Sequence, residues 1–203
     1  MNINQGWERV REYAGFGGMT ISLIAIGLGF GLVGCFVSDE EDKRTTRLIE
    51  GDLSVAKNEN ERFYALNGAA KNALAAGKTR DAIKLAEELE KLAPKYQDDW
   101  NYGNAVQVAN HVLGRIALSK GDVAEAKKRL LASADSEGSP QMNSFGPNMQ
   151  LARELLAKGE RDTVLKYFEL CRKFWMMGGG SLDRWTQEVK AGKTPDFGAN
   201  LSY

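Results

Sequence analysis

Histidine and cysteine are scarce in this chain of 203 residues, and neither sign of charge is in excess. The single histidine, His111, excludes a metal site built from several histidines, and two cysteines, Cys35 and Cys171, are too few for a disulfide framework or a structural zinc site. Basic and acidic residues both number 27, and the first 38 residues hold two of each, so the remaining chain carries 25 of each. This balance gives no general attraction to nucleic acid. We therefore expect no metal, no cofactor and no nucleic-acid partner.

The sequence also lacks a catalytic constellation. His111 has Asn110 and Arg115 nearby, but no nucleophile or paired carboxylate lies at a spacing suited to acid–base chemistry. A lone histidine on a helix is typical of a surface or of a groove wall. We therefore expect that the protein is not an enzyme.

An uncharged run, residues 13–38, precedes a charged, alanine-rich sequence of helical period. As a helix, these 26 residues would be about 39 Å long at ~1.5 Å per residue, enough to span a bilayer with some tilt. Gly27 and Gly31 form a G-x-x-x-G pair that Gly34 continues, and small residues at this spacing let membrane helices approach closely. The run predicts a transmembrane helix that packs on protein through these three glycines; the alternative is a lone glycine-rich anchor.

Two other interpretations of this N-terminal region stay open. Arg9 and Arg11 could begin a cleaved secretory signal, although the apolar stretch is longer than usual for one. Residues 32–35, Leu-Val-Gly-Cys, resemble a bacterial lipobox, which implies removal of residues 1–34 and lipidation of Cys35. A retained transmembrane helix and a lipidated Cys35 would each attach the protein to a membrane. Basic residues flank the run on both sides, and the short N-terminal tail favours a single-pass protein with its domain outside the cytoplasm.

Helical periodicity begins near Glu61, and three glycine-containing breaks with similar surroundings follow. Gly77, Gly121 and Gly159 each follow an apolar stretch that ends in a leucine and two small or polar residues. Glycine in this place is typical of a left-handed helix C-cap. The pattern predicts an all-α domain of antiparallel helix pairs, in which residues such as Phe63, Leu66, Ile116, Phe168 and Leu170 form the core.

These units resemble the tetratricopeptide repeat. The middle unit carries Leu113-Gly114, the turn glycine Gly121, then Ala126, with Leu130 in the aromatic position. The first unit matches at Gly77, Ala82 and Pro94, with Ala69-Ala70 and Ala86 as replacements. The third unit matches at Leu151-Ala152, Gly159 and Phe168, with Val164 in place of the alanine. The turn glycines lie 44 and 38 residues apart against 34 in the motif, so loops near residues 95–99 and 135–147 must absorb the excess. The resemblance implies a divergent repeat stack over about residues 60–176.

The resemblance also implies a concave groove lined by the first helix of each unit. The motif position after the Leu-Gly pair corresponds to Lys71, Arg115 and Arg153, and one turn earlier lie Asn67, His111 and Met149. This basic ladder resembles the carboxylate clamp of co-chaperone tetratricopeptide domains, which holds the C-terminal carboxylate of a peptide. The alternative is a set of ordinary solvated cations.

The expected organisation has four parts: residues 1–38 form the tail and transmembrane helix, 39–60 a charged helical stalk, 61–177 the repeats, and 178–203 the C-terminal region. In the C-terminal region we expect a glycine hinge, then a short capping helix with Ser181 as N-cap, and then an extended tail that packs back on the domain. We expect a membrane-anchored scaffold that binds protein partners through its groove and its transmembrane helix. Two alternatives are a permanent structural subunit of a membrane complex, held by the glycine-rich helix, and a lipoprotein lipidated on Cys35.

Overall fold

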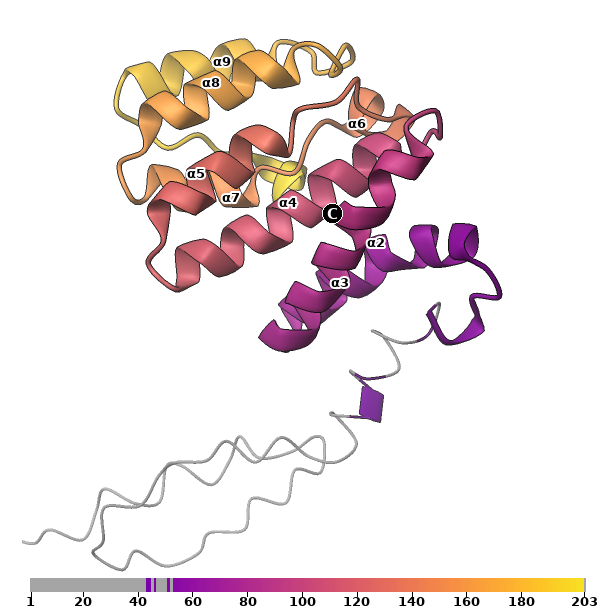
Figure 1. Ribbon diagram of the computed structural model, residues 1–203. Helices are drawn as coiled ribbons and strands as arrows, with labels where there is room; N and C mark the ends of the chain where they lie inside the picture. Colours follow the sequence, from indigo (N-terminus) through magenta and orange to yellow (C-terminus); the bar gives the residue numbers. More distant parts are fainter. Residues whose placement is uncertain (1–42, 45, 47–50, 52, 203) are drawn as a thin grey trace, which may run out of the picture. The chain divides into compact units, whose positions relative to one another are not determined.

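The computed structural model describes residues 43, 44, 46, 51 and 53–202, and every regular element in this part of the chain is helical (Figure 1). The elements are α2 (Glu59–Ala75), α3 (Thr79–Leu92), η2 (Ala93–Tyr96), α4 (Tyr102–Ser119), α5 (Val123–Ala132), α6 (Pro140–Phe145), α7 (Gln150–Leu156), α8 (Arg161–Cys171), α9 (Ser181–Lys190) and η3 (Gly198–Leu201). The prediction of an all-α domain is therefore confirmed for these residues. Within them, no helix is both long and apolar enough to cross a membrane, and the predicted segment 13–38 lies outside them.

Three helix pairs, α2/α3, α4/α5 and α7/α8, each turn at one of the predicted glycines. Gly77, Gly121 and Gly159 have φ angles of 71°, 82° and 84°, the left-handed region that glycine adopts without a Cβ penalty. After each glycine the next N–H donates back to a carbonyl of the last helical turn, for example Lys78 N to Ala73 O at 2.9 Å. This is the Schellman arrangement, so the prediction of glycine C-caps is confirmed.

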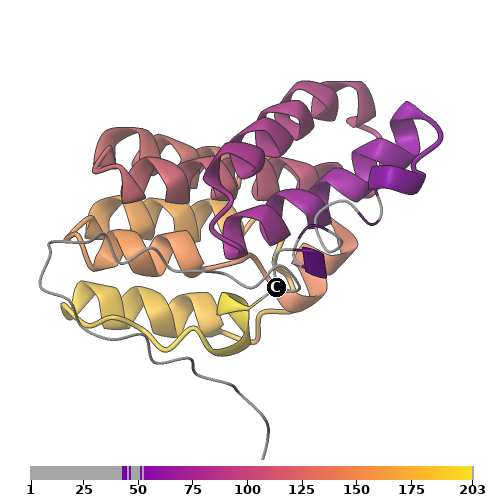
Figure 2. The same cartoon turned by 90° about the horizontal axis from the view of Figure 1, so that it is seen from below.

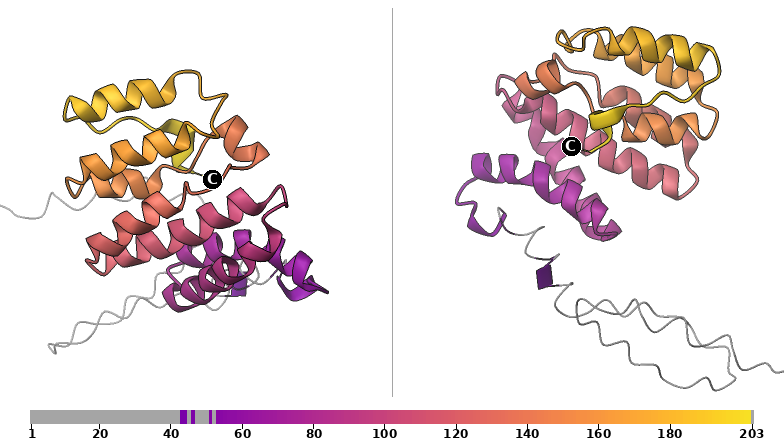
Figure 3. Two further views of the ribbon diagram at one scale, coloured as in Figure 1. Left: turned by 45° about the horizontal axis from the view of Figure 1, so that its top comes forward. Right: turned by 180° about the vertical axis from the view of Figure 1, so that it is seen from behind.

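The helices stack in chain order. α2 packs on α3, α3 on α4 and α4 on α5; beyond α5, α7 and α8 follow, and α9 covers α8. Figure 1 shows α2 and α3 at one end and α8 and α9 at the other, and the views from below and behind show the same order (Figures 2 and 3). Because α4 also contacts α2, α6 and α7, this helix is the central support of the stack.

The buried side chains form two clusters rather than one. The first lies among α2, α3 and α4 and includes Phe63 and Leu66, both without exposed surface. The second lies among α5, α7, α8 and α9 and includes Phe168. Of the predicted core residues, Ile116 is also buried, whereas Leu170 is only partly buried because it lies at the edge of the second cluster. The two clusters meet along α4 and α5, which leaves room for a cavity beside α4.

The segments between the repeats hold short helices where the sequence predicted loops. η2 follows α3, and the 135–147 connection contains α6, which Ser139 caps by accepting the Met142 N–H at 3.1 Å. The helix α9 begins at Ser181, so the N-cap is Gly180 and the prediction of Ser181 as N-cap is wrong by one residue. Gly180 occupies the N-cap position with a φ of 79°, in the left-handed region that glycine adopts without a Cβ penalty.

The C-terminal segment packs back on the domain, as predicted, but Gly198–Leu201 form the 3-10 helix η3, so the prediction of an extended tail is wrong there. Phe197 is 2% exposed and meets Trp185 edge-on, with ring centroids 4.9 Å apart. The Trp185 indole N–H donates to Asp196 O at 3.1 Å, and Met149 N donates to Asn200 O at 2.7 Å. Figure 3 shows this segment, in yellow, running from α9 back across the stack. It thereby reaches the side of α4 on which the cavity opens.

Candidate functional site

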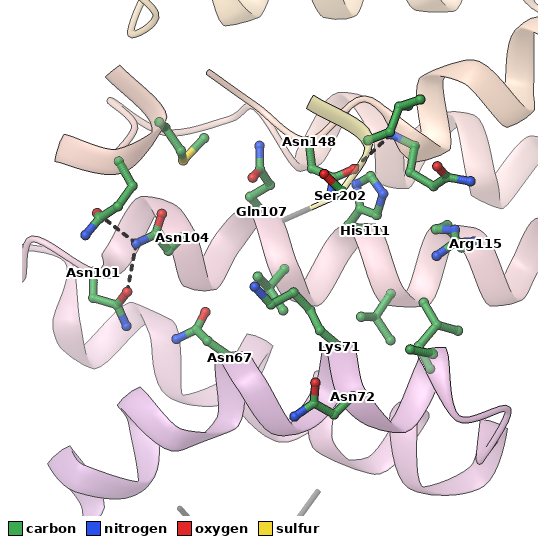
Figure 4. Close-up of a pocket in the computed structure, with 18 residues that line it drawn as sticks. Asn67, Lys71, Asn72, Asn101, Asn104, Gln107, His111, Arg115, Asn148 and Ser202 are labelled. Carbon is green, nitrogen blue, oxygen red and sulfur yellow. Dashed lines mark hydrogen bonds between the residues drawn. The ribbon is translucent and has the colours of Figure 1, made fainter. Parts of the chain in front are cut away.

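A cavity of about 520 Å³, lined by both polar and apolar side chains, lies beside α4 (Figure 4). α2 supplies one wall, α4 the second, and the region from α6 to the start of α7 closes it together with Leu201 and Ser202 of the C-terminal segment. Its lining residues are Asn67, Lys71, Asn72, Leu74, Ala75, Asn101, Asn104, Gln107, Val108, His111, Val112, Arg115, Gln141, Met142, Asn148, Gln150, Leu201 and Ser202. The lining thus combines a row of amides and cations with a few apolar side chains, and none of these described residues is acidic.

Four of the five predicted groove residues line this cavity: Asn67, Lys71, His111 and Arg115. Arg153 does not line it, because it lies on the exposed side of α7, where its Nη2 donates to Gln150 Oε1 at 3.0 Å. Met149, which the motif placed on the groove wall, is fully buried immediately before α7. Since α7 is a short helix, only its first turn reaches the cavity.

At one end of the cavity the polar side chains satisfy each other. Asn104 Nδ2 donates to Asn101 Oδ1 at 2.9 Å and to Gln141 Oε1 at 3.2 Å. The side-chain oxygen Asn104 Oδ1 accepts a hydrogen bond from the Ser139 hydroxyl at 2.6 Å. These hydrogen bonds hold the start of α6 against the start of α4, so the polar groups at this end of the cavity stabilise the fold.

At the other end an ion pair joins α4 to α7. Two nitrogens of Arg115 donate to the Glu154 carboxylate: Nη2 to Oε1 at 2.7 Å, and Nε to Oε1 at 3.0 Å and to Oε2 at 3.1 Å. Gln150 Nε2 donates to the same carboxylate at 2.8 Å. Glu154 neutralises Arg115, and the bidentate geometry fixes the guanidinium at the cavity edge. Arg115 is therefore a weaker anion ligand than the sequence suggested.

His111, in the middle of the row, is 7% exposed, so it is buried in the cavity wall rather than a surface residue. Its Nε2 accepts the Leu151 N–H at 3.2 Å. Burial, together with the charges of Arg115 and Lys71, lowers the pKa of His111 to about 3. The ring is therefore neutral at physiological pH, and because Nε2 accepts, we assign the proton to Nδ1.

Three buried polar atoms of the cavity wall have no hydrogen-bond partner: Asn67 Oδ1, Gln107 Nε2 and His111 Nδ1. Buried polar groups are almost always paired, and leaving one unpaired costs about 1–3 kcal/mol. Lys71 on α2 faces the same space and forms no ion pair in the described part of the chain. It reaches solvent, but the surrounding groups displace part of its water shell, which lowers its pKa. The unpaired groups thus lie in the middle of the cavity, between one end where the amides hydrogen-bond to each other and another where Arg115 pairs with Glu154.

The sequence interpretation missed Gln107, which proves central. Gln107 lies one helical turn before His111 on α4, so the i, i+4 rule that linked His111 to Arg115 would have included it. The repeat motif points only to the position after the Leu-Gly pair and to the residue one turn earlier, so it does not include Gln107. Leu201 and Ser202 were not predictable from spacing, because only the folded C-terminal segment brings them to α4.

Other predicted sites lie elsewhere. Gly27, Gly31, Gly34 and Cys35 are outside the described residues. Cys171 is a free thiol buried in the second core cluster, where burial raises its pKa strongly. In the described part of the chain, no group of three or more histidine, cysteine or acidic side chains is placed to hold a metal ion.

The chain matches no protein-family model, no curated protein and no solved structure. The cavity and its chemistry therefore carry the functional argument.

Proposed function

We propose that the protein is a membrane-tethered helical scaffold, and that the cavity beside α4 binds a carboxylate-bearing segment of a partner protein. The observation that carries the proposal is Lys71, which faces a cavity without an acidic lining residue and forms no ion pair within the described chain. An ammonium in such surroundings attracts an anion, and partial exclusion of water strengthens the attraction. The resemblance to a carboxylate clamp points the same way.

The roles of the predicted clamp residues differ. Lys71 supplies the free positive charge, while Arg115, already paired with Glu154, orders α7 and shapes the cavity edge. His111 contributes as a neutral donor, since its pKa is far below physiological pH. This division supports recognition of one carboxylate rather than of a highly charged anion.

The tether is the other half of the proposal. It is supported by the uncharged run at residues 13–38, which would hold the domain at a membrane and raise the local concentration of a membrane-bound partner.

The test compares Lys71→Gln with Lys166→Gln in the full-length protein in detergent micelles. Lys166 is an exposed lysine of α8 outside the cavity, so it is a matched control. Fluorescence anisotropy with a random-sequence hexapeptide pool, bearing either a free C-terminal carboxylate or a C-terminal amide, measures binding. We expect Lys71→Gln to weaken binding of the carboxylate pool about three- to tenfold, because a partly exposed charge-assisted bond is lost.

Lys166→Gln should bind like the unmodified protein. Equal affinities of the Lys71→Gln and Lys166→Gln proteins for the carboxylate pool, or no binding of that pool by the unmodified protein, would overturn the proposed function.

A further inference from the structure

The middle of the cavity wall holds both unpaired hydrogen-bond donors and an unpaired acceptor. Of the three unpaired buried atoms, Gln107 Nε2 and His111 Nδ1 are donors, whereas Asn67 Oδ1 is an acceptor. The orientation of the Asn67 amide is supported by its Nδ2, which lies 3.4 Å from Phe63 O. A ligand that completes this set must therefore both accept and donate hydrogen bonds.

This requirement excludes a simple anion as the whole ligand. A carboxylate or an inorganic anion only accepts, so it would leave Asn67 Oδ1 buried and unpaired. A peptide unit offers one C=O and one N–H, which match the two kinds of unpaired group. Gln107 and His111 lie one turn apart on α4, about 6 Å along the helix, which is close to the span of two residues of extended chain at ~3.3 Å each.

Figure 4 shows how these side chains are placed. Gln107 and His111 extend from α4 into the cavity, and Asn67 and Lys71 extend from α2 below them. Lys71 and Arg115 both act electrostatically on His111. The apolar side chains of Val108, Val112 and Met142 provide surface against which small side chains of a ligand can rest.

We propose that Asn67, Gln107 and His111 bind the main chain of the partner segment, over about two extended residues next to the carboxylate that Lys71 attracts. This inference rests on the proposed function, and it adds what the site recognises: the peptide backbone rather than particular side chains. Binding is then tolerant of sequence, and the carboxylate fixes the register.

The energetic signature of such a site differs from that of a structural network. In the free protein, the unpaired Gln107 amide lowers stability, so an apolar replacement of similar length raises it. The same replacement removes a ligand contact. A residue that only supports the fold would show the opposite change in stability.

The decisive variant is Gln107→Met in the full-length protein, with Gln187→Met, an exposed glutamine of α9, as the matched control. We expect Gln107→Met to raise the melting temperature of the free protein and to weaken binding of the carboxylate hexapeptide pool about three- to tenfold. Gln187→Met should change neither property.

A second measurement changes the ligand instead of the protein. In a depsipeptide pool, an ester replaces the last peptide bond, which removes one N–H and leaves the C-terminal carboxylate. We expect this pool to bind about three- to tenfold more weakly than the parent pool, and Asn67→Leu to abolish the difference.

The inference is overturned if the ester pool binds as tightly as the parent pool, or if Gln107→Met lowers stability or leaves affinity unchanged. If affinity still falls in Lys71→Gln under those outcomes, the proposed carboxylate site stands and only the main-chain recognition fails. If a free dicarboxylate such as succinate displaces the pool from both the Gln107→Met and the unmodified protein with equal potency, the site is one for small anions, which also overturns the inference.

Discussion

At the scale of single residues, His111 shows how its surroundings in the cavity wall fix the protonation state of a side chain. Its imidazole is neutral because burial and two neighbouring cations oppose protonation. The Leu151 N–H donates to Nε2, so the proton lies on Nδ1, which is buried without a hydrogen-bond partner. The sequence left open a surface or a groove wall for this histidine; on a surface it would titrate near neutral pH and would not keep one tautomer.

The depressed pKa predicts a specific dependence of stability on pH. The pKa of histidine is about 6.5 in the unfolded chain and about 3 in the folded protein. The unfolded state therefore binds a proton first as pH falls, so this contribution to stability is complete above about pH 6.5 and is lost progressively toward pH 3. Between pH 6 and pH 4 the loss approaches about 1.4 kcal/mol per pH unit.

Urea denaturation of the full-length protein and of His111→Gln, followed by circular dichroism at several pH values, measures this dependence. Glutamine can still accept the Leu151 N–H but does not titrate, so its curve should lack the histidine slope. Carboxylates titrate in both proteins and cancel in the difference. Parallel curves between pH 6 and pH 4 would show that His111 is not kept neutral.

At the scale of elements, α4 sets the geometry because its Gly114 lets neighbouring helices approach closely, whereas Gly68 of α2 has no such contact. A Cβ at Gly114 would lie 2.5 Å from Leu151 Cδ2 and 2.9 Å from Arg129 Cβ, so α5 and α7 could not approach α4 as they do. A Cβ at Gly68 of α2 would meet no atom within 4 Å. The first glycine therefore serves packing, and the second only weakens its helix.

These environments predict opposite effects of the same substitution. Gly68→Ala should stabilise the protein by about 1 kcal/mol, because alanine favours the helix and meets no neighbour. Gly114→Ala should destabilise it by about 1–3 kcal/mol, because buried Leu151 has little space to move. The two variants control for each other in chemical denaturation, and a gain of stability in Gly114→Ala would contradict the close packing of α4 and α7.

The sequence predicted the helix pairs well because their turns use local chemistry. A glycine after an apolar helix is a short-range signal, and Gly77, Gly121 and Gly159 all behave as such. The cavity was predicted less completely. Asn67, Lys71, His111 and Arg115 were found from helical spacing, but the pairing of Arg115 with Glu154 joins residues far apart in sequence, and no local pattern indicates it. Arg153 was misplaced because it lies on the exposed side of α7, away from the cavity.

At the scale of the domain, the cavity exists because two core clusters meet at α4 without filling the space beside it. The C-terminal segment then covers part of this space, and it is fixed by Asn200, whose Nδ2 donates to Phe145 O and Pro147 O. The ligand site is thus assembled from both ends of the described chain. A ligand in the cavity would contact α2, α4 and the C-terminal segment together, so we expect binding to stabilise the whole stack rather than one repeat.

The membrane tether is the remaining feature of the whole chain that an experiment can decide. If residues 13–38 anchor the protein, the full chain should stay in the membrane pellet after an alkaline carbonate wash, whereas a variant lacking residues 1–38 should be found in the supernatant. The deletion should leave the carboxylate-pool affinity unchanged, because every proposed ligand contact lies in residues 67–202.

Intact-mass measurement of the full chain then distinguishes a retained helix from cleavage before a lipidated Cys35. Release of the full chain by carbonate would refute the tether. If Gly27→Leu with Gly31→Leu instead releases the protein from a detergent-stable assembly, the structural-subunit alternative is favoured, because those substitutions change only helix packing.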